Sequence, residues 1–212
     1  MKLIIMIFIC FFVSLDAISF SKIISKATVH TRKQLSASYG FFIPGNNWKA
    51  ASSVVNKLNT SMSEIHTEPD TVFGQEIKLR YESYSWNFID FRLGIDLQTV
   101  TDKKLTYSNM LYAVDVVDSI YKTFKHQILA VGSIAYSPSA KITANDEQLT
   151  GTSLKYALSF EWVYSWLQFW SVKTVLGYQY HQINQFQTTD RFDPSYMAIR
   201  GIVLSCGINY TL

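Results

Sequence analysis

The sequence is poor in cysteine and in net charge. Its two cysteines are Cys10 and Cys206, and Cys10 lies in an apolar N-terminal run that we expect to be removed. Cys206 would then stand alone in the mature chain, which excludes an intramolecular disulfide there. The formal net charge of +3 is small and the basic residues do not cluster, so we expect no nucleic-acid partner.

Long hydrophobic runs are also lacking after the N-terminus. Lys2 and the run "LIIMIFICFFV" have the charge and length of a signal-peptide core, and the run is too short to span a bilayer. Small residues between positions 17 and 21 indicate cleavage, so we assign 1–21 to a signal peptide, with an uncleaved anchor as the alternative. No later run of ~18 apolar residues predicts a transmembrane helix. Secretion, the periplasm and a bacterial outer membrane remain.

The sequence does have many aromatic residues, with 13 Tyr, 14 Phe and 5 Trp, and it alternates apolar with polar side chains. In "FIDFRLGIDLQ" the odd positions from Ile89 to Leu97 are apolar, while the even positions from Asp90 to Gln98 are charged, polar or glycine. Successive side chains of a strand point to opposite faces. This segment therefore predicts a strand with one apolar face and one ionic face.

Alternation of this kind predicts eight strands, over residues 35–43, 74–85, 89–99, 107–117, 125–136, 154–165, 169–182 and 197–212. The predicted connections include long loops over 44–73, 137–153 and 183–196, and tight turns at Trp86-Asn87 and Trp166-Leu167. Short turns on one rim and long loops on the other are typical of membrane barrels. We therefore expect an all-β, antiparallel up-and-down transmembrane barrel over residues 22–212, with ten strands as the alternative.

The first long loop has an amphipathic pattern of its own. Apolar residues recur there at three- and four-residue steps after "IPGNN", which predicts a short helix with an asparagine cap. Packing at the barrel mouth or against lipid headgroups is the use we favour, and recognition of an external protein ligand is the alternative. The residues are Trp48, Ala51, Val55, Leu58 and Met62.

Side-chain size indicates which face of the strands points inward. The polar faces carry small residues among their charges, whereas the apolar faces carry Trp, Tyr, Phe and Leu. An eight-stranded lumen is narrow, so small residues belong inside and bulky apolar residues belong outside, against lipid. A secreted lipocalin-like barrel would reverse the faces. The small residues are Gly94, Ser133, Ala157, Ser159, Gly177, Ser205 and Gly207.

Aromatic residues gather at both ends of the predicted strands and suggest two interfacial belts. About nine residues separate the belts, which in a tilted strand span roughly 25 Å. The aromatic core of a soluble sandwich is the alternative. The belt at the tight turns holds Trp86, Trp162, Trp166 and Trp170, and the belt toward the long loops holds Tyr107, Tyr136, Tyr156, Tyr178 and Tyr180.

The sequence ends in "LSCGINYTL", in which Ile208, Tyr210 and Leu212 share a face. This pattern resembles the C-terminal signal read by barrel-assembly machinery, with Leu212 in place of the usual Phe. The mature chain resembles the small eight-stranded outer-membrane barrels of the OmpA and OmpX type. That resemblance implies a bacterial outer-membrane location, contact with membrane lipid and lipopolysaccharide, and insertion by the assembly machinery.

Charges inside such a lumen need partners. A three-residue turn with Ser85 opposite Ile89 sets Glu82 beside Arg92 and Lys78 beside Asp96. A register shifted by two residues would oppose like charges, so we favour the first.

The second tight hairpin gives a similar result. Placing Ser165 opposite Phe169 brings Glu161 beside Lys173. Both hairpins predict a lumen plugged by ion pairs, not an open pore.

No catalytic constellation stands out. His181 in "YHQIN" lies near the height of the His of lipid A deacylases, but position 183 is Ile where those enzymes carry Ser. Asp190 and Asp193 resemble an omptin protease site only loosely, and the histidines lack metal-ligand spacing. We expect no enzyme activity, metal or cofactor.

The function we expect is that of a structural or surface-interaction barrel, in adhesion, envelope integrity or immune evasion, acting through its long loops. A narrow channel or transporter for small solutes and a lipid A-modifying enzyme are the alternatives.

Overall fold

A computed structural model describes residues 33–44, 73–86, 89–101, 105–144, 147–187 and 192–212. The predicted signal peptide, nearly all of the loop predicted over 44–73, and the helix predicted within that loop lie outside these ranges. Within them, no helix is long and apolar enough to cross a bilayer.

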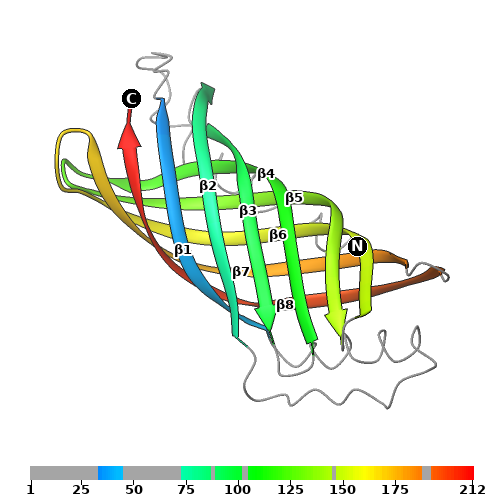
Figure 1. Cartoon of the computed structure of the whole chain (residues 1–212). Helices are drawn as coiled ribbons and strands as arrows, with labels where there is room; N and C mark the ends of the chain where they lie inside the picture. Colours follow the sequence, from blue (N-terminus) through cyan, green and yellow to red (C-terminus); the bar gives the residue numbers. More distant parts are fainter. Residues whose placement is uncertain (1–32, 45–72, 87–88, 102–104, 145–146, 188–191) are drawn as a thin grey trace. The chain divides into compact units, whose positions relative to one another are not determined.

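Eight antiparallel strands form a closed barrel in sequence order, and the first strand pairs with the last (Figure 1). This confirms the predicted all-β barrel and its strand number. The strands are β1 (Gln34–Pro44), β2 (Phe73–Trp86), β3 (Ile89–Thr101), β4 (Leu105–Lys122), β5 (His126–Ala144), β6 (Glu147–Ser165), β7 (Trp170–Gln187) and β8 (Phe192–Thr211).

The two ends of the barrel are named here by their connections. The turns that join β4 to β5 and β6 to β7 lie at the same end as the C-terminus, and we call this the short-turn end (Figure 1). Pro44, where β1 ends, and Phe73, where β2 begins, lie at the other end, which we call the loop end.

The strands are strongly staggered. A row of paired residues that starts at Gln34 returns to β1 at Pro44, ten residues further along the same strand. With ordinary strand spacing and rise, this stagger tilts eight strands by about 42°, and the lumen has room for side chains alone. The row passes through Glu82, Arg92, Asp115, Ser133, Ala157, Gln179 and Gly201.

The strand ends correct two predicted loops. Strands β5 and β6 occupy most of 137–153, because they run to Ala144 and from Glu147. Strands β7 and β8 likewise occupy most of 183–196, since they run to Gln187 and from Phe192. The outward side chains of these extensions include many Ser, Thr, Asn and Gln residues, so the extensions lack the apolar outer face by which strands were predicted.

The tight turns also differ in register from the prediction. In the first hairpin Trp86, not Ser85, pairs with Ile89, and a bulge between Glu82 and Tyr84 offsets the difference. In the second, Ser165 pairs with Ser171 and not with Phe169.

The four-residue connection Trp166–Phe169 accounts for the second difference. Its backbone N–H groups at Trp166 and Leu167 both donate to the carbonyl oxygen of Trp170, at 3.1 Å each. The turn therefore closes later along β7 than predicted.

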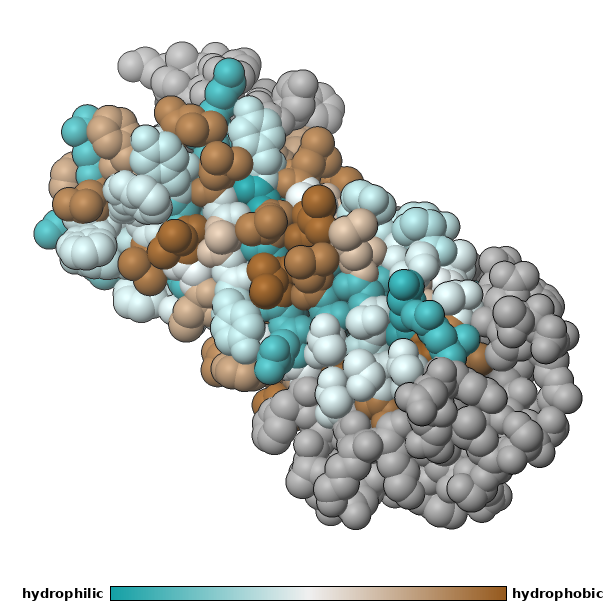
Figure 2. Space-filling view, in the orientation of Figure 1, coloured by the Kyte–Doolittle hydropathy of each residue, from teal (hydrophilic) through white to brown (hydrophobic). Residues whose placement is uncertain are grey.

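The outer surface of the barrel is apolar and its interior is charged. Leu93, Leu158 and Leu204 face outward with 49%, 54% and 52% of their surface exposed, whereas Asp96 and Lys155 are buried. Figure 2 shows apolar side chains gathered across the middle of the visible face. This arrangement inverts that of a soluble protein, and it confirms the predicted assignment of faces.

Candidate functional site

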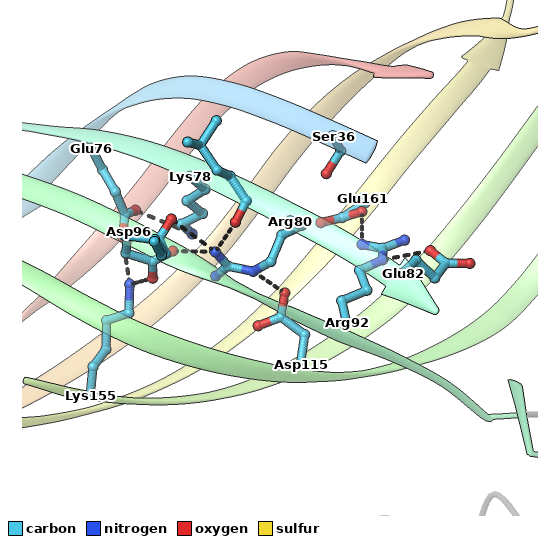
Figure 3. Close-up of polar contacts among 12 residues, drawn as sticks. Ser36, Glu76, Lys78, Arg80, Glu82, Arg92, Asp96, Asp115, Lys155 and Glu161 are labelled. Atoms are coloured by element: carbon cyan, nitrogen blue, oxygen red, sulfur yellow. Dashed lines mark hydrogen bonds and ion pairs between the residues drawn. The ribbon is translucent and has the colours of Figure 1, made fainter. Parts of the chain in front are cut away.

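Six charged side chains meet in the loop-side part of the lumen, and we call them the β2–β6 network. Lys155 Nζ donates to Glu76 Oε1 at 2.6 Å and also contacts the Asp96 carboxylate. Arg80 pairs with the same Asp96. Three cations face three carboxylates, so the network is neutral in net charge (Figure 3). Its members are Glu76, Lys78 and Arg80 from β2, Asp96 from β3, Asp115 from β4 and Lys155 from β6.

Arg80 reaches across this network because its neighbour on β3 has no side chain. A Cβ atom at Gly94 would lie 2.7 Å from Arg80 Cδ, closer than two carbon atoms can approach. The Arg80 guanidinium donates to Asp115 Oδ2 at 2.6 Å and to the carbonyl oxygens of Leu79 and Ile95 at 3.1 and 3.3 Å. Gly94 therefore allows one guanidinium to connect β2 with β4.

Four more charges form a second neutral set nearer the short-turn end, the Arg92 network. Arg92 Nε donates to Glu82 Oε2 at 2.9 Å, and Arg92 Nη1 donates to Glu161 Oε2 at 2.7 Å. Lys173 Nζ lies 3.9 Å from Glu161 Oε1 and donates to Ser36 Oγ at 3.2 Å. Arg92 is the centre of this set.

Of the two ion pairs predicted for the first hairpin, the structure contains one. Glu82 and Arg92 lie opposite each other and bond directly. Lys78 is opposite Asp96 in backbone register, yet its ammonium pairs with Glu76 Oε2 at 3.2 Å. The Asp96 carboxylate contacts Arg80 and Lys155 instead.

The pair Glu161 and Lys173 shows the effect of the corrected turn. Glu161 lies opposite Val175, and Lys173 lies opposite Val163. The two side chains are thus diagonal neighbours, which makes their contact long, and Glu161 bonds to Arg92 on another strand.

Sequence reasoning missed Glu76, Arg80, Asp115 and Lys155 as members of the site. Several of their contacts join strands that are not neighbours, such as β2 with β6 and β2 with β4, and hairpin registers do not reach that far. Inward parity was the available signal, because all four alternate with outward apolar residues on their own strands.

His181 belongs to an uncharged cluster on the loop-end side of the β2–β6 network. The Tyr107 hydroxyl lies 3.3 Å from His181 Nδ1, and Asn109 Nδ2 donates to the Tyr107 hydroxyl at 2.7 Å and to Ser153 Oγ at 3.0 Å. Tyr107 is fully buried, so its predicted place in the outer belt is wrong. It occupies an inward position of β4, in step with Leu105 and Leu111.

Within the described part of the chain, His181 contacts the Tyr107 hydroxyl and the Phe42 ring. Asp190 and the side chain of Asp193 lie outside the described part of the chain. Across that part, no group of three His, Cys, Asp or Glu side chains is arranged to hold a metal ion.

Apolar side chains cluster toward both ends of the lumen. The larger cluster lies at the loop end and the smaller one near the short turns. A polar hollow of about 30 Å³, large enough to hold water, lies at the short-turn end between Arg92, Asp90 and Asn209. The clusters are Phe42, Val100, Leu105, Tyr107, Ala140, Ile142, Leu149, Ile183, Ile199 and Val203, and Val117, Leu129, Val131 and Val163.

Apart from Tyr107, the predicted belt and assembly-signal residues with described side chains lie on the outer face. Trp166 is the most exposed of the belt at 70%, and the Trp86 side chain is outside the described part. The outward residues are Trp162, Trp166, Trp170, Tyr136, Tyr156, Tyr178 and Tyr180 from the belts, and Ile208, Tyr210 and Leu212 from the C-terminal segment.

A closed eight-stranded barrel with an apolar exterior and a packed, charged interior defines the class of outer-membrane β-barrels. Comparison with solved structures agrees. The chain is similar to Neisserial surface protein A, with a TM-score of 0.54 and 10% identity over 87% of this chain and 99% of that one. At this identity the similarity shows the fold alone.

Two further structures are similar at lower scores. They are the outer membrane protein OprG from Pseudomonas aeruginosa (TM-score 0.47, 11% identity, 87% of this chain and 98% of that one) and a major outer membrane protein from Thermus thermophilus (0.46, 11%, 85% and 99%). Neither a protein-family model nor a curated protein sequence matches the chain.

Proposed function

We propose that the protein is a structural and surface-interaction barrel of the bacterial outer membrane, serving adhesion, envelope integrity or immune evasion. The observation that carries this proposal is the filled lumen. Two neutral ion-pair networks lie between apolar clusters at both ends. A pathway for solutes would have to displace buried charges whose separation costs several kcal/mol, so the outer rim is the part available to a partner.

The long connection between Pro44 and Phe73 supports a role at the cell surface. In barrels of this class short turns face the periplasm and long connections face outward. The loop end would then lie outside the cell, and the ends of β5 to β8 would project there with it.

Two experiments test location and orientation. Outer-membrane fractionation should recover the mature protein, with different gel mobility before and after boiling. In whole cells, a membrane-impermeant maleimide should label Lys141→Cys and spare Lys125→Cys, because these residues lie on opposite rims. The wild type, whose Cys206 is on the outer face, gives the background.

Recovery as a soluble periplasmic protein would contradict the proposal. Labelling of Lys125→Cys alone would show that the barrel has the opposite orientation in the membrane. For the role itself, a deletion strain should become sensitive to detergent or lose attachment to host cells. Complementation with the wild-type chain should restore either property. A deletion strain unchanged in both would count against the proposed role.

A narrow solute channel is the second candidate. Both amide atoms of the buried Gln179 lack a protein partner, and the hollow beside Arg92 opens at one end of the lumen. These polar features would favour a hydrated path, and conductance decides between the two functions.

A further inference from the structure

The two rims of the barrel differ in their aromatic chemistry. The short-turn rim exposes Trp and Phe side chains, including Phe124 at 94% and Trp166 at 70%. Among the described side chains, the loop-side rim of strands β4 to β7 exposes tyrosines but no Trp or Phe, whereas at the short-turn rim Tyr121, at 53%, is exposed together with Phe124 and Trp166. Tyr hydroxyls both donate and accept hydrogen bonds, whereas Trp only donates and Phe does neither. Two identical leaflets would give no reason for this difference. The tyrosines are Tyr112, Tyr136, Tyr156 and Tyr178.

These tyrosines form a stepped row that reaches a cation. Tyr112 lies opposite Tyr136 on the neighbouring strand. Tyr136 lies opposite Leu154, and Tyr156 lies opposite Ile134, so the row shifts by two residues between β5 and β6. Tyr156 lies opposite Tyr180, which in turn lies opposite Arg200 of β8. Arg200 is exposed on the outer face of the barrel. A guanidinium thus continues the line of phenol groups around the barrel.

Beyond the tyrosine row, strands β4 to β7 continue as a polar wall toward the loop end. Paired across the strands are Ser108 with Lys141 and Lys141 with Thr150. Further rows join Thr106 to Thr143 and Thr143 to Gln148. Lys141 is exposed. Among the outward side chains that the structure describes on this wall and on the β8 segment beside it, the charged ones are both cations, Lys141 and Arg200.

The apolar surface, the tyrosine row with its cations and the polar wall follow one another toward the loop end. Acyl chains, phosphates and sugars follow one another in the same order in a phosphorylated glycolipid. Acyl chains need an apolar surface, which Leu158 and its neighbours supply. Phosphates need cations and hydroxyl donors at the edge of that surface, and Arg binds them with two parallel hydrogen bonds. Sugars need hydroxyl and amide partners further out, as the polar wall provides.

We propose that the outer face of β4 to β8 at the loop end is a docking surface for lipopolysaccharide. The phosphates of its lipid A lie against the tyrosine row, Lys141 and Arg200, and its core sugars lie along the polar wall. Lys141 reaches down toward the phosphates along its own aliphatic stem. This inference rests on the proposed outer-membrane location, since only the outer leaflet of that membrane carries such a lipid.

Binding of fluorescent lipopolysaccharide to the full mature chain, refolded in neutral detergent, tests the proposal. Both rims are accessible in a micelle, so the protein itself must select one. We expect the double variant Lys141→Glu/Arg200→Glu to bind about tenfold or more weakly than the wild type, because two attractive charges become repulsive. The matched control is Lys122→Glu/Lys125→Glu at the short-turn rim. It makes the same change in net charge and should stay within about twofold of the wild type.

Three further arms identify the groups that are bound. With lipopolysaccharide from which the lipid A phosphates have been removed, the two double variants should bind with equal affinity. The two double variants should also have equal affinity for the anionic phospholipid phosphatidylglycerol. Tyr136→Phe/Tyr156→Phe should weaken binding of the intact lipid, since it removes two hydroxyl groups without changing the charge. Heat-modifiable gel mobility shows that each variant has folded.

Equal weakening by both charge-reversal variants, or an equal effect with phosphatidylglycerol, would overturn the proposal in favour of unspecific charge attraction. This outcome is separate from failure of the proposed function. Cell fractionation decides the location of the protein, whereas these binding measurements use purified protein.

Discussion

Arg80 of β2 and Asp115 of β4 are bonded across an intervening strand, with Arg80 Nε 2.6 Å from Asp115 Oδ2. Both side chains are buried, and Arg80 also pairs with Asp96. Contacts of this kind tie together strands that share no backbone hydrogen bonds. The lumen therefore contributes to the stability of the barrel.

Removal of the Arg80 guanidinium should be costly. Arg80→Met leaves Asp115 and Asp96 with less compensation in a buried site, and we expect a loss of ~3–5 kcal/mol in the free energy of unfolding. Arg80→Met/Asp115→Leu should lose less free energy of unfolding than the two single variants together, because the double variant also removes the buried Asp115 carboxylate that Arg80→Met leaves unpaired. Urea titration of the refolded barrel in lipid vesicles measures all three. Additive losses would mean that the two side chains do not interact.

A side chain at position 94 should disturb the same network without changing any charge. A Cβ atom at position 94 would lie 2.0 Å from the Leu79 carbonyl oxygen and 2.7 Å from Arg80 Cδ, so Gly94→Val must shift the backbones of β2 and β3 apart and also displace Arg80. We expect a cost of ~1–3 kcal/mol, typical of overpacking. If displacement of Arg80 contributes to this cost, Arg80→Ala should relieve part of it, because alanine has no atom at the Cδ position. Equal cost of Gly94→Val in both backgrounds would rule out that cause.

The two partners of Glu161 should differ in coupling energy. Arg92 bonds to Glu161 at 2.7 Å, whereas Lys173 is 3.9 Å away and is shared with Ser36. Double-mutant cycles with Glu161→Gln should therefore give a larger coupling for Arg92→Met than for Lys173→Met, by about 1 kcal/mol or more. The reverse order would support the originally predicted register, in which Glu161 faces Lys173.

A charged substitution at a lipid-facing position should destabilise the barrel more, the closer that position lies to the middle of the bilayer. Arg in place of Leu158, which is in the apolar band, should cost ~2–4 kcal/mol or block assembly. The matched control, Thr152→Arg, changes an outward residue of the same strand beyond the band and should cost less than ~1 kcal/mol. Yield of heat-modifiable protein and urea titration compare them, and equal tolerance would contradict the assigned outer face.

Side-chain parity explains how much of the fold could be predicted. Residues such as Arg92 and Leu93 alternate so regularly that strand, face and barrel class follow from the sequence. The extensions at 137–144 and 147–153 escaped prediction because outside the lipid band both faces of a strand can take polar residues. Tyr107 was misplaced for a related reason, since aromatic residues occur on both faces near the loop end.

The charged site could be predicted only within hairpins. Glu82 opposite Arg92 was found, although a bulge and a shorter turn replaced the expected three-residue turn. Lys155 with Asp96 and Arg92 with Glu161 are 59 and 69 residues apart in sequence. Their meeting depends on the stagger of the closed barrel, which local patterns do not determine.

Conductance across a planar bilayer tests the central claim, a closed lumen held by neutral ion networks, most directly. The purified wild-type barrel, inserted in the same bilayer and salt as a general porin control, should give no stable current steps, because apolar clusters and paired charges fill its lumen. Stable single-channel currents from the wild type, abolished when the protein is heat-denatured, would contradict a closed lumen and move the channel ahead of the surface-interaction role.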